Sequence, residues 1–412
     1  MNKSIERAFA ISWALGCCFY FMEYMIRSAP AVMIPELAHR LSVTPLVISG
    51  ILGAYYYTYS VTSLVAGAAL DRAGAKYPVS IGICVLAIGC LLFVIPSYLP
   101  EYLGRLCQGA GSAFAFTGCV YLASHGFSAR FIATAIGLTQ CIGMLGGSAG
   151  QFITGPLIQK GVGIAPLWIG LGVICVIIGL GLLMVIPREQ RSGERRTAPG
   201  GVLTPYRTVF SNPQSWMSGV VSGLLFAPTT LFAMTWGVAF FQQDLGWPYK
   251  KAVFICSMVP LGWVIGCPLL GWISDASGLR KPALSGGILV MLASFGALMF
   301  LPDVVPPVVS ALLFGIASGA AMIPYTIIKE ANPEYAKGSA TGGINFLTFS
   351  VTALLGPVFA GWFGRDLGST TDHAAHFRGA GGFFLLSIGI ALGISLIIRE
   401  TGQKKKLTSL AS

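Results

Sequence analysis

Apolar stretches long enough to cross a lipid bilayer as helices recur from one end of this chain to the other, separated by short polar connections. A bilayer offers no water to backbone amides and carbonyls, and a helix satisfies both within its own segment. The sequence therefore predicts an all-α membrane protein with twelve transmembrane helices, at residues 9–34, 46–70, 78–96, 99–124, 130–157, 163–186, 214–241, 251–274, 283–301, 307–328, 338–363 and 380–398.

Composition excludes several other classes of protein. Hydrophobic residues make up 55% of the 412 residues and charged residues only 10%, whereas about a quarter of the residues in a soluble domain are charged. A soluble enzyme, a disordered chain and a secreted disulfide scaffold are therefore excluded. The ten cysteines lie in apolar stretches without a CxxC pair, so we interpret them as small hydrophobic side chains.

Two further patterns concern metals and nucleotides. His373 and His376 have the spacing of metal ligands, but two weak ligands in a Gly- and Ser-containing loop do not make a site. The GxxxxGK[ST] motif that would cradle ATP phosphates does not occur. We therefore expect no enzymatic activity, no metal and no cofactor, and we expect a monomer in the lipid bilayer.

Basic residues are distributed unequally between the two sets of connections. If the N-terminus is cytoplasmic, most of the 26 Lys and Arg residues lie on the cytoplasmic side or at its boundary. The opposite side then holds only Arg40, Lys160, Lys250, Lys251, Arg365 and Arg378. Because positive residues accumulate in cytoplasmic loops, both termini are expected in the cytoplasm, in a bacterial inner (plasma) membrane. The net charge of +11 then reflects topology, not nucleic acid binding.

The chain divides into two halves that resemble each other. The longest internal polar stretch predicts an N-terminal six-helix bundle at 1–187, a cytoplasmic linker at 188–213, and a C-terminal six-helix bundle with a short basic tail at 214–412. The segment Gly67–Lys76 aligns with Gly271–Arg280, and residues 135–140 align more loosely with 340–345. Parallel repeats of this kind place the substrate site between the halves, near the membrane midplane.

The duplicated loop, G-x-x-x-D-x-x-G-x-[RK], resembles the signature of the major facilitator superfamily. The resemblance implies two pseudo-symmetric six-helix bundles that transport a solute by alternating access. It also implies a conformational latch in which each loop aspartate meets the N-terminus of a helix from the other half, an interaction worth about 0.3–2 kcal/mol. The latch residues are Asp71, Arg72, Gly74, Lys76, Asp275, Gly278, Arg280 and Lys281, with Arg105 from the glycine-rich motif of the fourth helix.

Each of these assignments has a simpler alternative. Asp71 and Asp275 could merely cap turns. Arg105 lies near the outer end of its predicted helix, where a long side chain could extend to the aqueous boundary.

The first two helices place ionisable and aromatic side chains at membrane depth. Glu23 and Arg27 lie one turn apart on one face of the first helix, with Tyr24 beside them, and Tyr55 and Tyr59 are one turn apart on the second. Ionisable groups at this depth are costly, and by default they indicate function. The alternative is a self-neutralising pair with a structural role only.

The first helix also looks like the anion:cation symporter branch of the superfamily. That resemblance implies that Arg27 binds the acid group of the substrate, with Tyr59 beside it. Gln140 and Asn345 match the branch too, and the position of Trp236 predicts that it faces the same region. The usual carboxylate before the arginine is replaced by Ile26, and where the branch often has one in the fourth helix this chain has only Gln108 and Gly111. We therefore assign proton coupling to Glu23.

These observations predict a secondary active transporter for a small polar organic solute, with an anion taken up by proton symport as the preferred case. One alternative is a drug or metabolite efflux antiporter, because residues 143–156 are rich in glycine, although the full efflux pattern is incomplete. A second alternative is a membrane sensor without transport activity. The expected partners are the substrate, the coupling proton and the lipid.

Overall fold

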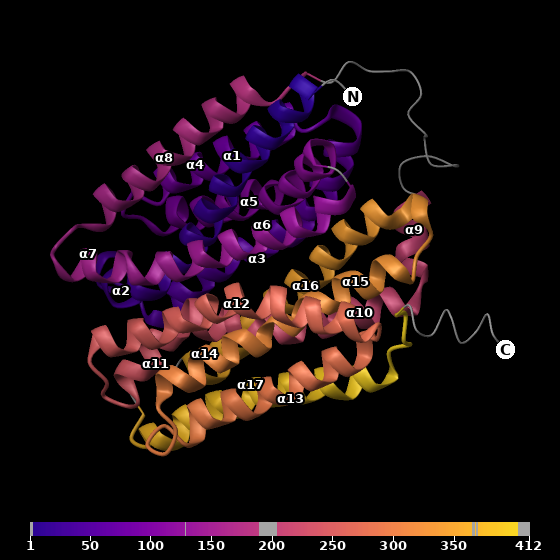
Figure 1. The fold of residues 1–412 in the computed structure, drawn as a ribbon. Helices are drawn as coiled ribbons and strands as arrows, with labels where there is room; N and C mark the ends of the chain where they lie inside the picture. The colour runs from indigo at the N-terminus through magenta and orange to yellow at the C-terminus, as the bar shows by residue number, and fades with distance from the viewer. Residues whose placement is uncertain (1–2, 128, 189–203, 365–366, 368–369, 403–412) are drawn as a thin grey trace.

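The computed structural model describes residues 3–127, 129–188, 204–364, 367 and 370–402, with the side chains of 3–6, 71, 129–134 and 334 excepted. Within these ranges the secondary structure is entirely helical. Figure 1 shows two bundles lying side by side, the N-terminal half in indigo to magenta and the C-terminal half in orange to yellow. The predicted all-α class and the major facilitator type of architecture agree with this arrangement.

The N-terminal bundle is formed by nine helical elements. They are α1 (Lys3–Ser28), η1 (Ala29–Val32), α2 (Ile34–Leu41), α3 (Pro45–Ala73), α4 (Lys76–Leu92), α5 (Tyr98–Gly126), α6 (Ala129–Phe152), α7 (Thr154–Gln159) and α8 (Ile164–Val185).

The C-terminal half follows after the short helix α9 (Thr204–Ser211), which belongs to the predicted linker. Its elements are α10 (Pro213–Ala227), η2 (Pro228–Trp236), α11 (Gly237–Gln243), α12 (Tyr249–Ser277), α13 (Arg280–Phe300), α14 (Pro307–Ser318), η3 (Gly319–Met322), α15 (Ile323–Glu330), η4 (Glu334–Ala336), α16 (Lys337–Phe359), η5 (Ala360–Gly364) and α17 (His373–Ile397).

Each of the twelve predicted spans overlaps a helix or an almost continuous series of helices. By length and hydropathy, nine helices of the described part could cross a membrane, or ten if α2 and α3, which meet at 110°, count as one span. α4 is an apolar helix of 17 residues, roughly 26 Å long, close to the thickness of the bilayer core. Large apolar side chains such as Ile177, Met184 and Leu396 are exposed, as expected where helices face lipid.

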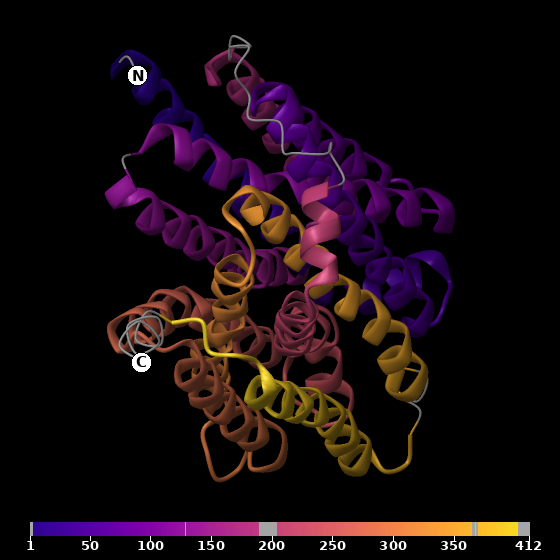
Figure 2. The same ribbon diagram turned by 90° about the vertical axis from the view of Figure 1, so that its right-hand side faces the viewer.

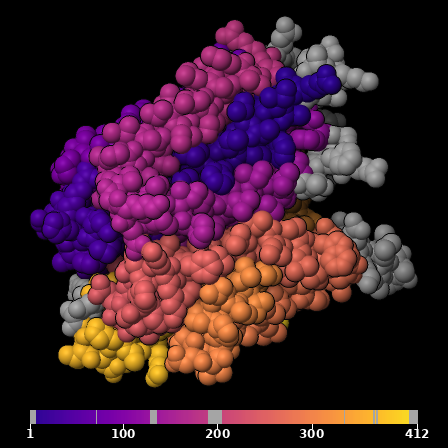
Figure 3. Space-filling model, turned by 60° about the vertical axis from the view of Figure 1, so that its left-hand side comes forward, coloured from indigo at the N-terminus to yellow at the C-terminus, as the bar shows by residue number. Residues whose placement is uncertain are grey.

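The two ends of the bundles are distinguishable, and we name them by their residues. The terminal face carries the start of α1, the turns at Gly74 and Gly278, and the end of α17, so both chain termini lie there (Figures 1 and 2). The opposite face carries the turns at Ser42 and Gly246. The bundles pack through α3 against α16 and α6 against α12, and Figure 3 shows their surfaces meeting.

The seventh predicted span changes its winding at Pro228. From there to Trp236 the chain forms the π-helix η2, every residue of which is buried. Two of its backbone carbonyls accept hydrogen bonds from the N-terminal half: Tyr56 Oη donates to Thr230 O at 3.5 Å, and Gln151 Nε2 donates to Ala233 O at 2.5 Å. Pro228 lacks a backbone N–H, so a carbonyl about one turn before it loses its helical partner, and Leu224 O at that position accepts a hydrogen bond from Ser387 Oγ at 3.0 Å instead.

Candidate functional site

The centre of the N-terminal bundle holds a buried triad of Glu23, Arg27 and Tyr55. Arg27 Nη2 forms an ion pair with Glu23 Oε1, as the spacing of one turn predicts. Arg27 Nε donates a hydrogen bond to Tyr55 Oη at 3.2 Å, and Tyr55 Oη donates to the same Glu23 oxygen. Because α1 supplies both charges and α3 supplies the phenol, the guanidinium of Arg27 is held by two partners, Glu23 and Tyr55, from two different helices.

An aromatic cage surrounds the Arg27 guanidinium. Its Cζ lies 4.3 Å from the ring centroid of Tyr24, 4.7 Å from that of Tyr59, 5.1 Å from that of Tyr55 and 5.0 Å from that of Phe349. Rings at such distances attract a cation, by about 0.5–2 kcal/mol each. Phe349 comes from α16 of the other half, so the cage closes across the interface. Only 2% of Arg27 is exposed as a result.

Both charged residues keep one polar atom without a hydrogen-bond partner. These atoms are Glu23 Oε2 and Arg27 Nη1. A buried donor or acceptor without a partner loses its interaction with water and gains nothing in return, at a cost of about 1–3 kcal/mol. The triad can therefore still take up a proton on Glu23 and an oxygen acceptor on Arg27.

Two amide side chains face a small cavity between the halves. The oxygen of Gln140 accepts a hydrogen bond from Tyr20 at 3.0 Å, and the oxygen of Asn345 accepts one from Tyr325 at 2.6 Å. In both amides the nitrogen is buried without a partner. Their cavity measures about 10 Å³, and Tyr24, Tyr59 and Phe349 also line it. Two free donors from opposite halves thus converge beside the arginine cage.

A larger cavity of about 300 Å³ extends from the terminal face to this centre. Asp275 and Lys329 line it near the terminal face, and Gln140 and Tyr325 line its inner part. Because Gln140 and Tyr325 also line the small central cavity, the two are adjacent. The aromatic residues between the two cavities separate Arg27 from the larger cavity.

Trp236 does not join the cluster around Arg27. It lines a separate cavity of about 340 Å³ in the half of the molecule toward the opposite face, together with Tyr56 and Thr235. Its indole packs against Phe240 and Phe359. The prediction that it faces the same region needs correction, because residues at the end of the π-helix η2 lie deeper toward the opposite face than the sequence position suggests.

Arg105 was assigned to the latch, with a side chain that extends to the aqueous boundary as the alternative. The structure excludes that alternative, since only 2% of Arg105 is exposed. Its Nη1 donates to Ile26 O and to Gln108 Oε1 at 2.7 Å, and its Cζ lies 4.8 Å from the ring centroid of Tyr55. These contacts all belong to the N-terminal bundle, so Arg105 supports the buried triad and is not part of the loops at the terminal face.

Each of the two duplicated loops turns at a glycine with a positive φ. Gly74 follows α3 with φ of 71°, and Gly278 follows α12 with φ of 66°, values that favour glycine. Arg72 lies in the last turn of α3, and Lys76 begins α4. The side chain of Asp71 lies outside the described residues.

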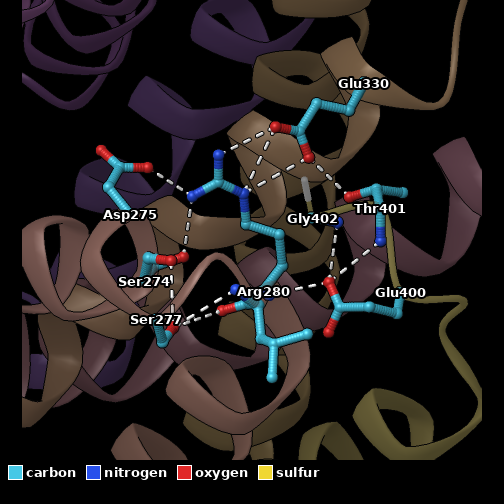
Figure 4. Close-up of polar contacts among 9 residues, drawn as sticks. Ser274, Asp275, Ser277, Arg280, Glu330, Glu400, Thr401 and Gly402 are labelled. Carbon is cyan, nitrogen blue, oxygen red and sulfur yellow. Dashed lines mark hydrogen bonds and ion pairs between the residues drawn. The ribbon is translucent and has the colours of Figure 1, made fainter. Parts of the chain in front are cut away.

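The loop of the C-terminal half holds an ion-pair network centred on Arg280 (Figure 4). Its guanidinium pairs with Asp275, and its Nη2 lies 2.9 Å from Glu330 Oε1. Ser274 Oγ accepts a further hydrogen bond at 3.0 Å, and Thr401 donates to Glu330 at 2.6 Å. The Asp275 side chain is 73% exposed and pairs within its own half, so this structure does not contain the predicted contact with a helix of the other half.

The chain after α17 returns to this network. Glu400 accepts hydrogen bonds from the backbone N–H groups of Arg280 at 2.7 Å and Lys281 at 2.9 Å, which begin α13. Burial raises the pKa of Glu400, but hydrogen bonds from the backbone N–H groups of Arg280, Lys281, Gly402 and Thr401 outweigh it and hold the pKa below its usual value. An anion here also meets the positive end of the α13 dipole.

The two histidines of the predicted loop lie at the opposite face. His373 and His376 begin α17, and their Nδ1 atoms lie 3.3 and 2.7 Å from the buried carboxylate of Asp244. His376 Nε2 lies 2.9 Å from Phe363 O. Among the described residues, no group of three or more His, Cys, Asp or Glu side chains is arranged to hold a metal ion.

Sequence reasoning missed three aromatic residues at the centre. Phe349 covers Arg27, Tyr325 holds Asn345, and Phe116 stacks near Tyr20 at 5.5 Å between ring centroids. Apolar aromatic residues are common in membrane helices, so nothing in the sequence marks these three. The spacing Asn345 to Phe349, one helical turn, is the single signal that could have indicated one of them.

Comparisons with known proteins agree with this architecture. The profile of the Major Facilitator Superfamily matches residues 16–357. The membrane sensor protein UhpC of Escherichia coli (strain K12) is 25% identical over 92% of this chain and 88% of its own. The MFS-type transporter SLC18B1 of Rattus norvegicus is 24% identical over 96% and 87%. A probable hexose phosphate transport protein of Chlamydia trachomatis is 24% identical over 92% and 87%.

A solved structure has a similar fold. It is the crystal structure of a bacterial homologue of the human lysosomal transporter Spinster, in an inward-facing and unoccupied conformation, with a TM-score of 0.75 over 95% of this chain and 97% of that chain. The sequence identity is 14%, so the likeness concerns the fold alone. The family profile, by contrast, spans most of this chain. The protein is therefore an integral multi-pass membrane protein that belongs to the Major Facilitator Superfamily.

Proposed function

We propose that this protein is a secondary active transporter that moves a small organic anion by alternating access and couples it to protons. The observation that carries the proposal is the Arg27 guanidinium, which is buried at the interface of the halves with Nη1 unpartnered. A protein could make the same position apolar without losing stability, so a buried charge with unused hydrogen-bonding capacity favours a role in binding.

The charge of the site favours a monoanion. Among the described residues that surround the cage, the C-terminal half contributes Phe349 and Asn345, which are uncharged. Arg27 supplies one positive charge, part of which Glu23 neutralises. A carboxylate matches the planar donor fork of an arginine, and the amide nitrogens of Gln140 and Asn345 suit hydroxyl or carbonyl oxygens. A polar monocarboxylate therefore fits better than a phosphate dianion.

Proton coupling follows from the same triad. When Glu23 is ionised, it neutralises Arg27 and repels an incoming anion. A proton on Glu23 releases Arg27, so proton and anion each favour the binding of the other, and by linkage the effect is reciprocal. The unpartnered Oε2 of Glu23 is the position available to that proton.

The distribution of basic residues supports the assignment of the terminal face to the cytoplasm, in a bacterial inner membrane. The 300 Å³ cavity then corresponds to access from the cytoplasm. The loop aspartates are assigned to the alternative state, in which they hold this side closed.

The test is uptake into proteoliposomes with an Arg27→Lys variant. Labelled gluconate serves as a polar monocarboxylate and labelled glucose 6-phosphate as a phosphate ester, each with an imposed pH gradient. Lysine keeps the charge but loses the planar fork. We expect gluconate uptake at least tenfold lower than wild type, with normal membrane insertion. Arg188→Lys, an exposed arginine, is the matched control and should transport as wild type.

Two outcomes would contradict the proposal. Equal binding of gluconate by wild type and Arg27→Lys would remove Arg27 from the site. If the protein instead prefers glucose 6-phosphate, the proposed monoanion is wrong, and the substrate is a hexose phosphate, the class in the name of the chlamydial relative.

A second candidate function is sensing, because one relative is a membrane sensor protein. A sensor would bind an anion but would not accumulate it in proteoliposomes. The same experiment distinguishes metabolite efflux from symport, because the two need pH gradients of opposite direction to drive the substrate into the proteoliposomes.

A further inference from the structure

A second acidic side chain lies inside the N-terminal bundle, away from the Arg27 cage. Glu101 is in the first turn of α5, near the opposite face, and its side chain is 0% exposed. Neither carboxyl oxygen has a hydrogen-bond partner. Both oxygens of an ionised carboxylate accept hydrogen bonds, and burying such a charge without them costs several kcal/mol. An acid in this position is stable when it carries a proton.

The cations around Glu101 do not provide the missing partners. Arg40 of α2 is the nearest, with 3.9 Å between its Nε and Glu101 Oε1, too long for a hydrogen bond. Arg40 Nη2 donates instead to Val94 O, and Arg40 Nη1 is buried without a partner, so no hydrogen bond joins Arg40 to Glu101. Arg105, one turn further along α5, donates to Ile26 O and Gln108.

Within the described residues, the helices α1, α3, α4 and α6, which pack against α5, bring no further charge to the end of α5 that carries Glu101. α3 and α4 carry their charged residues, Asp71, Arg72 and Lys76, at the terminal face. α1 carries Glu23 and Arg27 at mid-depth, and its remaining charged residues lie at the terminal face. The charged residue of α6, Arg130, also lies at the terminal face. The remaining titratable residues of α2 are Glu36 and His39, of which His39 is exposed.

Glu101 is also the first member of a buried polar row on one face of α5. Arg105, Gln108 and Ser112 follow it at intervals of four, three and four residues, and all are buried. Ser112 Oγ and Arg105 Nε have no partner. The row leads from the opposite face to Arg105, whose guanidinium contacts the Tyr55 ring of the triad.

We propose that Glu101 is a second proton-binding group of this protein, protonated in the present conformation, which exchanges its proton with water at the opposite face. The proton binds a carboxyl oxygen on uptake and returns to water on release. The role in coupling rests on the proposed function, in which Glu23 carries the coupled proton; a proton that Glu101 takes from and returns to the opposite face adds no net transfer of charge. The inferred charge state of Glu101 does not depend on the proposed function.

Infrared difference spectroscopy on the purified full-length protein in lipid tests the charge state at neutral pH. Glu101→Gln replaces the carboxyl by an amide of the same shape. We expect the variant to lose the carbonyl band of a protonated carboxyl that the wild type shows. Glu400→Gln is the control, because four backbone N–H groups hold that carboxylate ionised, and it should lose only an ionised-carboxylate band. Loss of an ionised band in Glu101→Gln would overturn the inference.

A second variant covers the case in which Glu101→Gln does not fold. Glu101→Asp keeps the acid on a shorter side chain, so it should retain a protonated-carboxyl band, shifted from that of the wild type. If no protonated-carboxyl band differs between the wild type and this variant, and only ionised-carboxylate bands change, the inference is overturned. The proposed function fails separately, if the wild type does not accumulate gluconate or glucose 6-phosphate under a pH gradient. The two failures are therefore distinguishable.

Discussion

The two six-helix halves share a fold but keep their buried charges in different places. In the N-terminal half, Glu23, Arg27 and Arg105 lie within the helices and away from their ends, and the further buried acid, Glu101 in the first turn of α5, is the one that we infer to be protonated and therefore uncharged. In the C-terminal half, the buried charged residues are Asp244, which follows α11, and Arg280, which begins α13, among the residues that the structure describes. One half holds charge in its core and the other holds it at its two ends.

This difference has a physical consequence. A charge in a low-dielectric core interacts strongly with any proton or ion that reaches it, so it is suited to binding. A charge at the end of a helix acts on the elements that meet there and is partly screened by water. We infer that the N-terminal half recognises substrate and proton, and that the C-terminal half mainly controls which face is open.

The strongest test of this division is Glu23→Gln. The amide mimics the protonated acid, so the variant should bind and exchange gluconate across the membrane. It should lose accumulation driven by a pH gradient almost completely, because no proton is taken up at Glu23. The measurement compares counterflow with gradient-driven uptake in proteoliposomes.

The matched control for this variant is Asp303→Asn, which removes an exposed acid from the C-terminal half. It should accumulate gluconate as wild type does. If Glu23→Gln still concentrates gluconate when only a pH gradient is supplied, the coupling site lies elsewhere, and the charged core of the N-terminal half is structural.

A smaller effect is expected at the two loops. Asp71→Asn and Asp275→Asn each remove a proposed latch worth about 0.3–2 kcal/mol, so the ratio of the two conformations should change by roughly 2- to 30-fold. Turnover should fall, while equilibrium affinity for gluconate should stay within a few-fold. Hydrogen exchange of the helices that line the two large cavities measures the populations of the two conformations.

The pair of loop variants also sharpens the comparison between halves. Asp275 pairs with Arg280 in this structure, so its variant should also loosen the start of α13. A loss of binding with unchanged populations in either variant would contradict the latch.

Much of this architecture was predictable from the sequence because hydropathy and helical spacing are local properties. The positions of the helices, the pairing of Glu23 with Arg27, and the turns at Gly74 and Gly278 follow from patterns of ten to twenty residues. Once the first and second helices are neighbours, helical spacing also explains why Tyr55 lies beside Glu23 and Arg27.

The remainder depends on contacts between distant segments. Phe349 covers Arg27 from 322 positions further along the chain, and Glu400 reaches the start of α13 across 120 residues. For Arg105, extension to an aqueous boundary stayed open as an alternative but the side chain is buried, because a sequence shows the end of a helix but not which side of it faces protein. Trp236 was misplaced because the π-helical winding of η2 has no clear sequence signal beyond Pro228.

The smallest predicted effect concerns Glu400→Gln, at the end of the C-terminal half. Backbone N–H groups lower the pKa of this carboxyl, so its ionised form stabilises the folded state above the ordinary pKa of about 4.3. The variant keeps the shape but loses the charge at the α13 N-terminus, worth about 0.3–1 kcal/mol, so Tm should fall by about 1–2 °C at pH 7. As the pH falls through the lowered pKa, the wild type loses the same stabilisation and the two Tm values should converge. A difference in Tm that persists in acid would mean that Glu400 acts through something other than its charge, and that charge at this end does not hold the C-terminal half together.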